Sequence, residues 1–274
     1  MNSSLPQLTP ELHERRERVF LVLAGIFLGS MAMLNIIGIT HFIHIGPLAL
    51  AVGVLPYPLT FLCTDLVSEL YGRRRANFLV MTGLMVNILV ICTLWLGQAL
   101  PAINEAARPD FLPTGSWNPA PWQVIQVSAP VFLPGGSALS GEVPLFSMIY
   151  ACSMGAMLAS MIAYLAAQFC DVALFHFWKR LTKGKHLWLR NNGSTMVSQI
   201  VDTTAVITIT FGGAYLAGEK TLSDLLVLIG SGYLFKMVIA LLDTIPLYIA
   251  VHYLSRWLQL DPNAEHNIDV ETVT

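Results

Sequence analysis

"PLTFLCTDLVSELYGRRRAN", residues 58–77, changes from apolar to charged within the length of one helix. Its first half is hydrophobic, and its second half carries Asp65 and Glu69, one turn apart, followed by a glycine and three successive arginines. In water, acidic side chains near the end of an apolar helix are simply solvated, whereas in lipid they need a polar partner or a wet cavity. The solvent around this helix therefore decides the fold.

Composition indicates a membrane protein. Of the 274 residues, 55% are hydrophobic and 12% are charged, whereas a soluble domain has about 25% charged residues. The net charge of −2 gives no sign of a nucleic-acid partner. The four cysteines lie in apolar stretches without a close pair, which is typical of core residues rather than of disulfides or metal ligands. We therefore expect a polytopic membrane protein without a metal or a cofactor.

Runs of about 20 apolar residues, the length that crosses a bilayer, predict an all-α fold with six transmembrane helices. An uncleaved first helix is favoured over a signal peptide, because its apolar core is longer than about 7–15 residues. The transmembrane domain is expected over 18–257, between cytoplasmic tails at 1–17 and 258–274. The six predicted helices are roughly 18–39, 45–69, 77–100, 145–172, 194–217 and 222–254.

Lysine and arginine bias predicts the orientation. With the N-terminus in the cytoplasm, only Arg108 and Lys220 fall in external segments, and Lys236 lies within the sixth helix. Both termini are then cytoplasmic, and the arginine triplet anchors the second helix at the inner face. The external connection at about 101–144 is poor in charge and rich in proline, glycine and tryptophan. A surface loop is favoured over a lid, because long loops cost little extra entropy.

Six charged side chains lie inside the predicted helices, where each costs about 2.5–3.5 kcal/mol on insertion scales and normally faces a protein interior or a wet cavity. Helical spacing groups them with other polar residues, and Pro56 and Pro58 are expected to disturb the second helix at mid-membrane. A polar chamber open to the cytoplasm would satisfy the whole set. Its members are Asp65 and Glu69, Ser160 with Tyr164, Gln168 and Asp171, Gln199 with Asp202, and Lys236 with Asp243.

Structural explanations compete for several of these residues. Glu69 could reach the interface and pair with the arginine triplet, and Asp171 could form an interfacial salt bridge. Lys236 could be a neutral buried amine or the counter-ion of the acids. Gly25 and Gly29 predict a close helix contact, within the fold or with a partner.

Four stretches together resemble the vitamin uptake transporter family, which includes bacterial queuosine-precursor transporters: "PLTFLCTDLVSELYGRRRA", "ASMIAYLAAQFCDV", "TKGKHLWLRNNGSTMVSQIVDT" and "YLFKMVIALLDTIPLY". The resemblance implies import of 7-cyano-7-deazaguanine or 7-aminomethyl-7-deazaguanine across the bacterial inner membrane for tRNA modification. It also implies a fold related to the substrate-binding subunits of energy-coupling-factor transporters. One departure is Gly155, where the family often has arginine.

A deazaguanine presents adjacent N–H donors that a carboxylate can accept together, and an O6 acceptor for an amide or a lysine. Asp202 or Asp65 is the predicted partner of the donors, with Gln168, Gln199 and Lys236 around the rest. Phe61, Tyr164 or Phe211 would supply a stacking face, and Asp65, Glu69 or Asp243 could instead carry a coupling proton.

Two other functions, an enzyme and a binding subunit, compete with a self-sufficient importer. No G-x-x-x-x-G-K-[ST], H-E-x-x-H or G-x-S-x-G motif occurs, so an enzyme is disfavoured. A binding subunit that needs a separate ATP-driven module is the main alternative, with Gly25 and Gly29 as its docking face. A homodimer is also compatible with the sequence.

Overall fold

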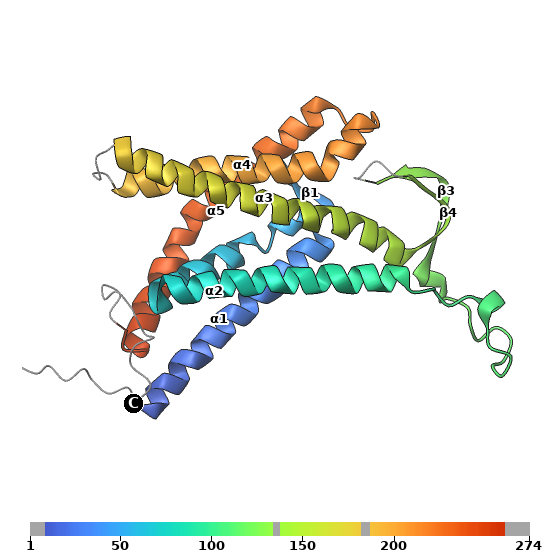
Figure 1. The fold of residues 1–274 in the computed structure, drawn as a ribbon, viewed down its shortest axis with the longest axis horizontal. Coiled ribbons are helices and arrows are strands. Elements are labelled where there is room, and N and C mark those ends of the chain that lie inside the picture. The colour runs from blue at the N-terminus through green and yellow to red at the C-terminus, as the bar shows by residue number, and fades with distance from the viewer. Residues whose placement is uncertain (1–8, 134–137, 182–186, 261–274) are drawn as a thin grey trace, which may run out of the picture. The chain divides into compact units, whose positions relative to one another are not determined.

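The computed structural model describes residues 9–133, 138–181 and 187–260, and these residues are mostly helical (Figure 1). Helices dominate as expected, but two β-hairpins correct the all-α prediction. The helices are α1 (Pro10–Ile37), α2 (Tyr57–Ala99), α3 (Leu145–Leu181), α4 (Leu187–Leu216) and α5 (Leu222–Trp257). The strands are β1 (Phe42–Ile45), β2 (Leu48–Ala51), β3 (Val124–Phe132) and β4 (Ala138–Pro144), and short 3₁₀ turns occur at Val52–Val54, Glu105–Ala107 and Pro121–Gln123.

Within the described residues, four helical stretches are long and apolar enough to cross a bilayer. Together they make the chain a multi-pass membrane protein. They are Pro10–Ile37, Arg74–Ala99, Leu145–Tyr164 and Leu222–Trp257.

Gly72 breaks α2 into two helices. Its φ of 83° and ψ of 165° lie in a region that is essentially reserved for glycine. The first helix, 57–71, is about 22 Å long at 1.5 Å per residue, which is shorter than a hydrocarbon core of about 30 Å. The turn between Asp65 and the arginines is therefore set by a single glycine.

The predicted second span is wrong over 45–56, where the chain forms the β1–β2 hairpin and a 3₁₀ turn. Ile45 pairs with Leu48 across a two-residue turn, and Gly46 supplies the positive φ of 57° that such turns need. Pro56 and Pro58 then lie at the start of α2, where the missing N–H groups have no helical partner to lose. The prolines begin this helix and do not interrupt it, contrary to the expectation.

Contacts divide the chain into two compact units. The first holds the described residues of 1–34, 55–87 and 236–274. Its core gathers Phe27 from α1, Val67 and Leu79 from the two parts of α2, and Leu258 after α5. Helix α1 begins at Pro10, and Leu260, after the end of α5, is still buried.

The start of α1 and the end of α5 meet in this first unit. Helix α5 ends in a Schellman-type cap, in which Leu260 N donates to Ser255 O at 2.8 Å and Gln259 has a φ of 49°. From α1, Arg16 donates Nε to Leu258 O at 3.0 Å and Nη2 to Gln259 O at 2.9 Å. A cation thus meets the negative end of the α5 dipole.

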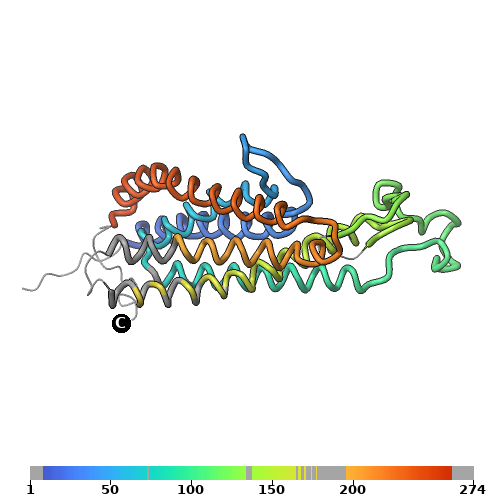
Figure 2. The backbone as a smooth tube through the Cα atoms, turned by 90° about the horizontal axis from the view of Figure 1, so that it is seen from above, coloured from blue at the N-terminus to red at the C-terminus, as the bar shows by residue number. Residues whose placement is uncertain are grey.

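The second unit comprises the described residues of 35–54 and 88–235. Helices α3 and α4 run side by side in it (Figures 1 and 2), and β3 pairs antiparallel with β4 within the connection between α2 and α3. At the end of α2, an added Cβ on Gly97 would lie 2.7 Å from Phe146 Cζ, and Ser147 Oγ donates to Gln98 Oε1 at 3.1 Å. The two ends of the 100–144 connection are therefore held together.

Candidate functional site

One face of the first part of α2 carries an aromatic pair and an acid. Tyr57, Phe61 and Asp65 follow at i, i+4 and i+8, so they share that face. The rings of Tyr57 and Phe61 lie 5.5 Å apart, edge to face. The fold thus places two of the predicted binding residues, Phe61 and Asp65, one turn apart.

Lys236 joins this face from α5. Its Nζ lies 4.9 Å from the centroid of the Tyr57 ring, and the side chain is only 6% exposed. A buried ammonium over an aromatic face is a stabilising cation–π arrangement. Tyr57 was not among the predicted site residues.

A buried acid, Asp243, lies two helical turns beyond Lys236 on α5. Asp243 is 9% exposed, and its Oδ2 is a buried acceptor without a hydrogen-bond partner among the described residues. An acceptor left open in this way can take a donor from a ligand, or a proton.

One arginine of the triplet, Arg75, makes its contacts with α1 and with the end of the first part of α2. Arg75 pairs with Glu17 of α1 at 2.8 Å, and its guanidinium lies over the Phe20 and Tyr71 rings at 5.2 and 5.7 Å. This arginine therefore holds α1 against the Gly72 turn. Glu69 itself is exposed.

The second unit holds the other predicted site residues that the structure describes. Gln199 and Asp202 are partly exposed on α4, and Tyr164 is exposed on α3. The side chains of Gln168 and Asp171 lie outside the described part of the chain. These residues stay predictions as ligands.

Helices α4 and α5 pack closely at Thr203, the residue after Asp202. An added Cβ on Gly232 of α5 would lie 3.3 Å from Thr203 Cγ2, so this glycine lets α5 approach α4. Within the described residues, the hydroxyls of Thr203 and Thr210 are buried without a partner. The face of α4 next to Asp202 thus keeps unused polar groups.

Phe211 packs and leaves no face for a substrate. It is 2% exposed, its ring lies 5.9 Å from that of Phe42 on β1, and Lys220 Nζ lies 5.5 Å from its centroid. The contact joins the β1–β2 hairpin to the turn between α4 and α5. Phe211 is therefore a structural residue, and the stacking candidates that keep an accessible ring are Phe61 and Tyr164.

The glycines singled out in the sequence lie in open surroundings. Added Cβ atoms on Gly25, Gly29 and Gly155 would meet nothing within 4 Å. Packing within the described chain therefore does not require glycine at Gly25 or Gly29, and the predicted contact within the fold is not found there. Gly155 likewise leaves room for a larger side chain.

Comparison with known proteins identifies the family. The model of the family described as "Putative vitamin uptake transporter" matches residues 51–250. A Bacillus subtilis (strain 168) protein named "Probable queuosine precursor transporter" is 24% identical over 220 residues, which are 80% of this chain and 79% of that protein. No solved structure matches the chain significantly. Because the family match covers most of the chain, including both parts of α2 and nearly all of α5, the chain belongs to the vitamin uptake transporter family.

Proposed function

We propose that this protein imports queuosine precursors, 7-cyano-7-deazaguanine, 7-aminomethyl-7-deazaguanine or both, across the bacterial inner membrane for tRNA modification. Family membership supports transport, and the name of the Bacillus subtilis relative supports this class of substrate. The substrate crosses unchanged, so the protein is not an enzyme. The aromatic, acidic and cationic group of the first unit is the observation that carries the proposal.

The chemistry of this group suits a deazaguanine. The Asp65 carboxylate would accept the adjacent N1–H and exocyclic amine, as bidentate carboxylate pairs do. Lys236 would donate to O6, and Phe61 would stack on the planar ring system, with Tyr57 held behind it by its edge-to-face contact. Asp243 would accept a further donor or carry a coupling proton.

The proposed topology has six passes with both termini in the cytoplasm. The helices 10–37, 57–71, 74–99, 145–181, 187–216 and 222–257 would cross in alternating directions. The contact of Arg16 with the end of α5 supports placing both termini on one side. The Arg75–Glu17 pair supports placing the Gly72 turn there too, in agreement with the positive-inside rule.

The main alternative is a substrate-binding subunit that needs a separate ATP-driven module. The open surroundings of Gly25 and Gly29 favour it, because small residues let another helix approach closely. An ATPase that co-purifies with the protein and is required for uptake would establish this alternative. Uptake by the purified chain alone in vesicles would exclude it.

The proposal is tested by measuring queuosine in tRNA from cells that cannot make the precursors, fed each base in turn. Cells that express the protein should regain the modification, and cells that express Asp65→Asn should not, because an amide cannot accept both donors. Asp110→Asn, in the external connection, is the matched control and should behave as the unsubstituted protein. Failure of the unsubstituted protein, present in the membrane at normal levels, would refute a self-sufficient deazaguanine importer.

A further inference from the structure

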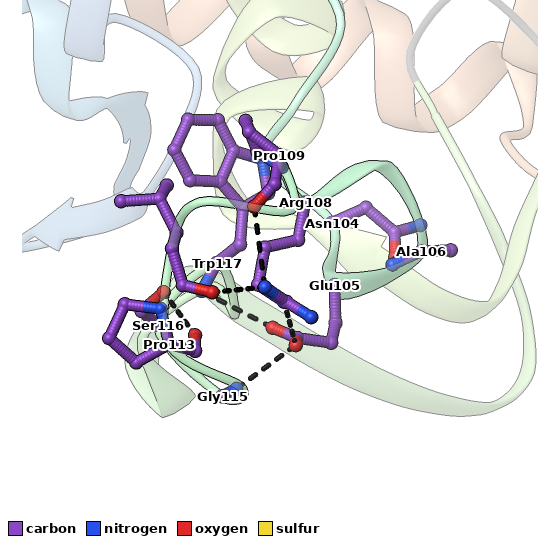
Figure 3. A network of polar contacts seen from close by, with 10 residues as sticks. Asn104, Glu105, Ala106, Arg108, Pro109, Pro113, Gly115, Ser116 and Trp117 are labelled. Atoms are coloured by element: carbon purple, nitrogen blue, oxygen red, sulfur yellow. Dashed lines mark hydrogen bonds and ion pairs between the residues drawn. The ribbon is translucent and has the colours of Figure 1, made fainter.

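The external connection after α2 is built around one carboxylate. Glu105 Oε1 accepts from Arg108 Nε at 2.7 Å and from Gly115 N at 3.0 Å, and Glu105 Oε2 accepts from Trp117 N at 3.3 Å (Figure 3). These bonds tie together residues up to twelve positions apart. The segment 104–117 is therefore an ordered loop with its own internal frame.

The same network shapes a turn that presents Phe111. Leu112 N donates to Pro109 O at 3.0 Å, which closes a β-turn with Phe111 in its third position. The Arg108 guanidinium donates to both Pro109 O and Leu112 O (Figure 3). Phe111 is nevertheless 84% exposed, so the frame holds a large apolar ring out of the protein.

Phe111 is part of a longer series of exposed apolar residues. Trp122 is 71% exposed in the same connection, and Leu96, Leu100 and Ile103 are exposed at the end of α2 and just after it. Single exposed apolar residues are ordinary, whereas several large ones in one short connection indicate a contact surface. The connection that carries them begins directly at the end of a helix long and apolar enough to span a bilayer.

The position of the loop base favours lipid as the partner. The contacts of Gly97 with Phe146 and of Gln98 with Ser147 join the ends of two spanning helices directly beneath the loop. Glu105 and Arg108 form an ion pair. Neither of these two charges would therefore be left unpaired if the loop entered the polar boundary of the bilayer. Asp110, next to Phe111, is exposed and can stay among the headgroups.

We propose that this loop is a membrane-interface anchor, in which Phe111 and Trp122 insert at the boundary between headgroups and acyl chains. Tryptophan and other aromatic side chains prefer this depth, because the ring is apolar and its edge is polar. The anchor would fix the outer ends of α2 and α3 relative to the bilayer. It does not depend on which substrate the protein carries.

Spin-label depth measurements in phosphatidylcholine nanodiscs test the anchor. In a full-length variant with its four cysteines replaced by alanine, a nitroxide is placed on Phe111→Cys or Trp122→Cys. Leu89→Cys, on the lipid-facing side of α2, serves as the lipid control, and Glu11→Cys, at the start of α1, as the water control. Collisions with oxygen and with a water-soluble nickel chelate are then compared.

The anchor predicts that labels at 111 and 122 lose accessibility to the nickel chelate and retain it to oxygen, as at 89. Accessibility to nickel as high as at 11 would overturn the proposal, because the ring would be in water. Protection from both reagents would also overturn it, because the ring would be packed on protein, as in a lid or a protein partner.

A second measurement needs no substitution. Hydroxyl-radical footprinting of the intact chain in the same nanodiscs should show slow oxidation of Phe111 and Trp122 despite their exposure in the structure. Rapid oxidation of both side chains would refute the anchor even if the cysteine-free variant failed to fold.

Discussion

Lys236 and Lys220 offer a controlled comparison at the scale of single residues, because both ammonium groups lie over aromatic rings. Lys236→Met should weaken precursor binding by about 10–100-fold, because a hydrogen bond to a charged group contributes about 1.5–3 kcal/mol and each 1.4 kcal/mol is tenfold. Lys220→Met should leave the affinity unchanged, since its contacts are with Phe42 and Phe211. Fluorescence titration of the purified variants checks this, and equal losses would contradict the assigned role of Lys236.

Asp243 and Asp224 differ in the hydrogen bonds that their carboxylates accept. Asp243 has an open buried oxygen, whereas Asp224 Oδ2 accepts from Thr221 N at 2.8 Å and Thr221 Oγ1 at 2.7 Å. Asp243→Asn should therefore raise the midpoint of thermal unfolding while reducing uptake, since functional groups are often held at a cost in stability. Asp224→Asn should lower the midpoint and leave uptake intact. A lowered midpoint for Asp243→Asn would mean that its charge is structural.

Charged residues of the site were visible in the sequence because an acid or a lysine stands out within an apolar run. Asp65, Lys236 and Asp243 were predicted in this way, and their role as ligands stays a prediction. Tyr57 was not, because an aromatic residue in an apolar run carries no such signal, and the helix was expected to begin twelve residues earlier than it does. Arg16 was read only as a topological charge, since its contact with Leu258 joins residues 242 positions apart.

Among the elements, the turn at Gly72 depends most on one residue. Gly72→Ala places a Cβ on a backbone with φ 83° and ψ 165°, which costs about 1–3 kcal/mol, so the thermal midpoint should fall. Gly155→Ala is the control. Gly155 lies within α3, and an added Cβ there would meet nothing within 4 Å. Alanine also favours a helix over glycine by about 0.5–1 kcal/mol. Thermal unfolding in detergent, followed by thiol labelling of buried Cys63, gives both midpoints. Similar shifts of the same sign would show that the turn tolerates a side chain.

The stability of the 104–117 loop is expected to depend on pH. The Gly115 N–H, and then the Arg108 guanidinium, hold the pKa of Glu105 below its ordinary value of 4.5. Because the folded pKa is the lower one, the stabilisation is complete above the ordinary value and is lost as the pH falls through the folded value. Hydrogen exchange at the Gly115 and Trp117 amides should therefore stay protected at neutral pH and lose protection only in acid. In Glu105→Gln the protection should be weaker and the acid step absent, and a step that persists in this variant would assign it to another group.

Five of the six predicted helices have a counterpart, and seven of their ten ends lie within three residues of the prediction, because their apolar runs are long. The run at 45–56 was misread as helix, because periodicity cannot separate a short apolar strand from a helix. Gly46-Pro47 and Pro56 were the local signals of the hairpin and of the later helix start. Likewise the β3–β4 hairpin, Val124–Phe132 with Ala138–Pro144, lay in a connection read only for its composition.

At the scale of the whole molecule, the contribution of the Arg16 contacts can be measured as a change in stability. Arg16→Gln removes two hydrogen bonds to the carbonyls that end α5, and charges at helix ends contribute about 0.3–2 kcal/mol. Arg15→Gln removes the same charge from an exposed neighbouring position, so both variants change the positive-inside balance equally. Only Arg16→Gln should lower the unfolding midpoint and increase hydrogen exchange near Leu260. Equal effects would mean that the contact between the two ends does not contribute.

That contact also constrains the number of passes. Arg16 at the start of α1 binds the carbonyls at the end of α5. In the proposed topology both would then lie at the same membrane face, and the number of passes between them would be even. Six passes satisfy this, with the short helix 57–71 counted as a crossing. Fluorescent-protein fusions, which fluoresce in the cytoplasm and not after export, should be bright at either terminus, and alkaline phosphatase fused within 101–123 should be active outside. A dark C-terminal fusion beside a bright N-terminal one would require an odd number of passes and would break the Arg16 contact in the membrane.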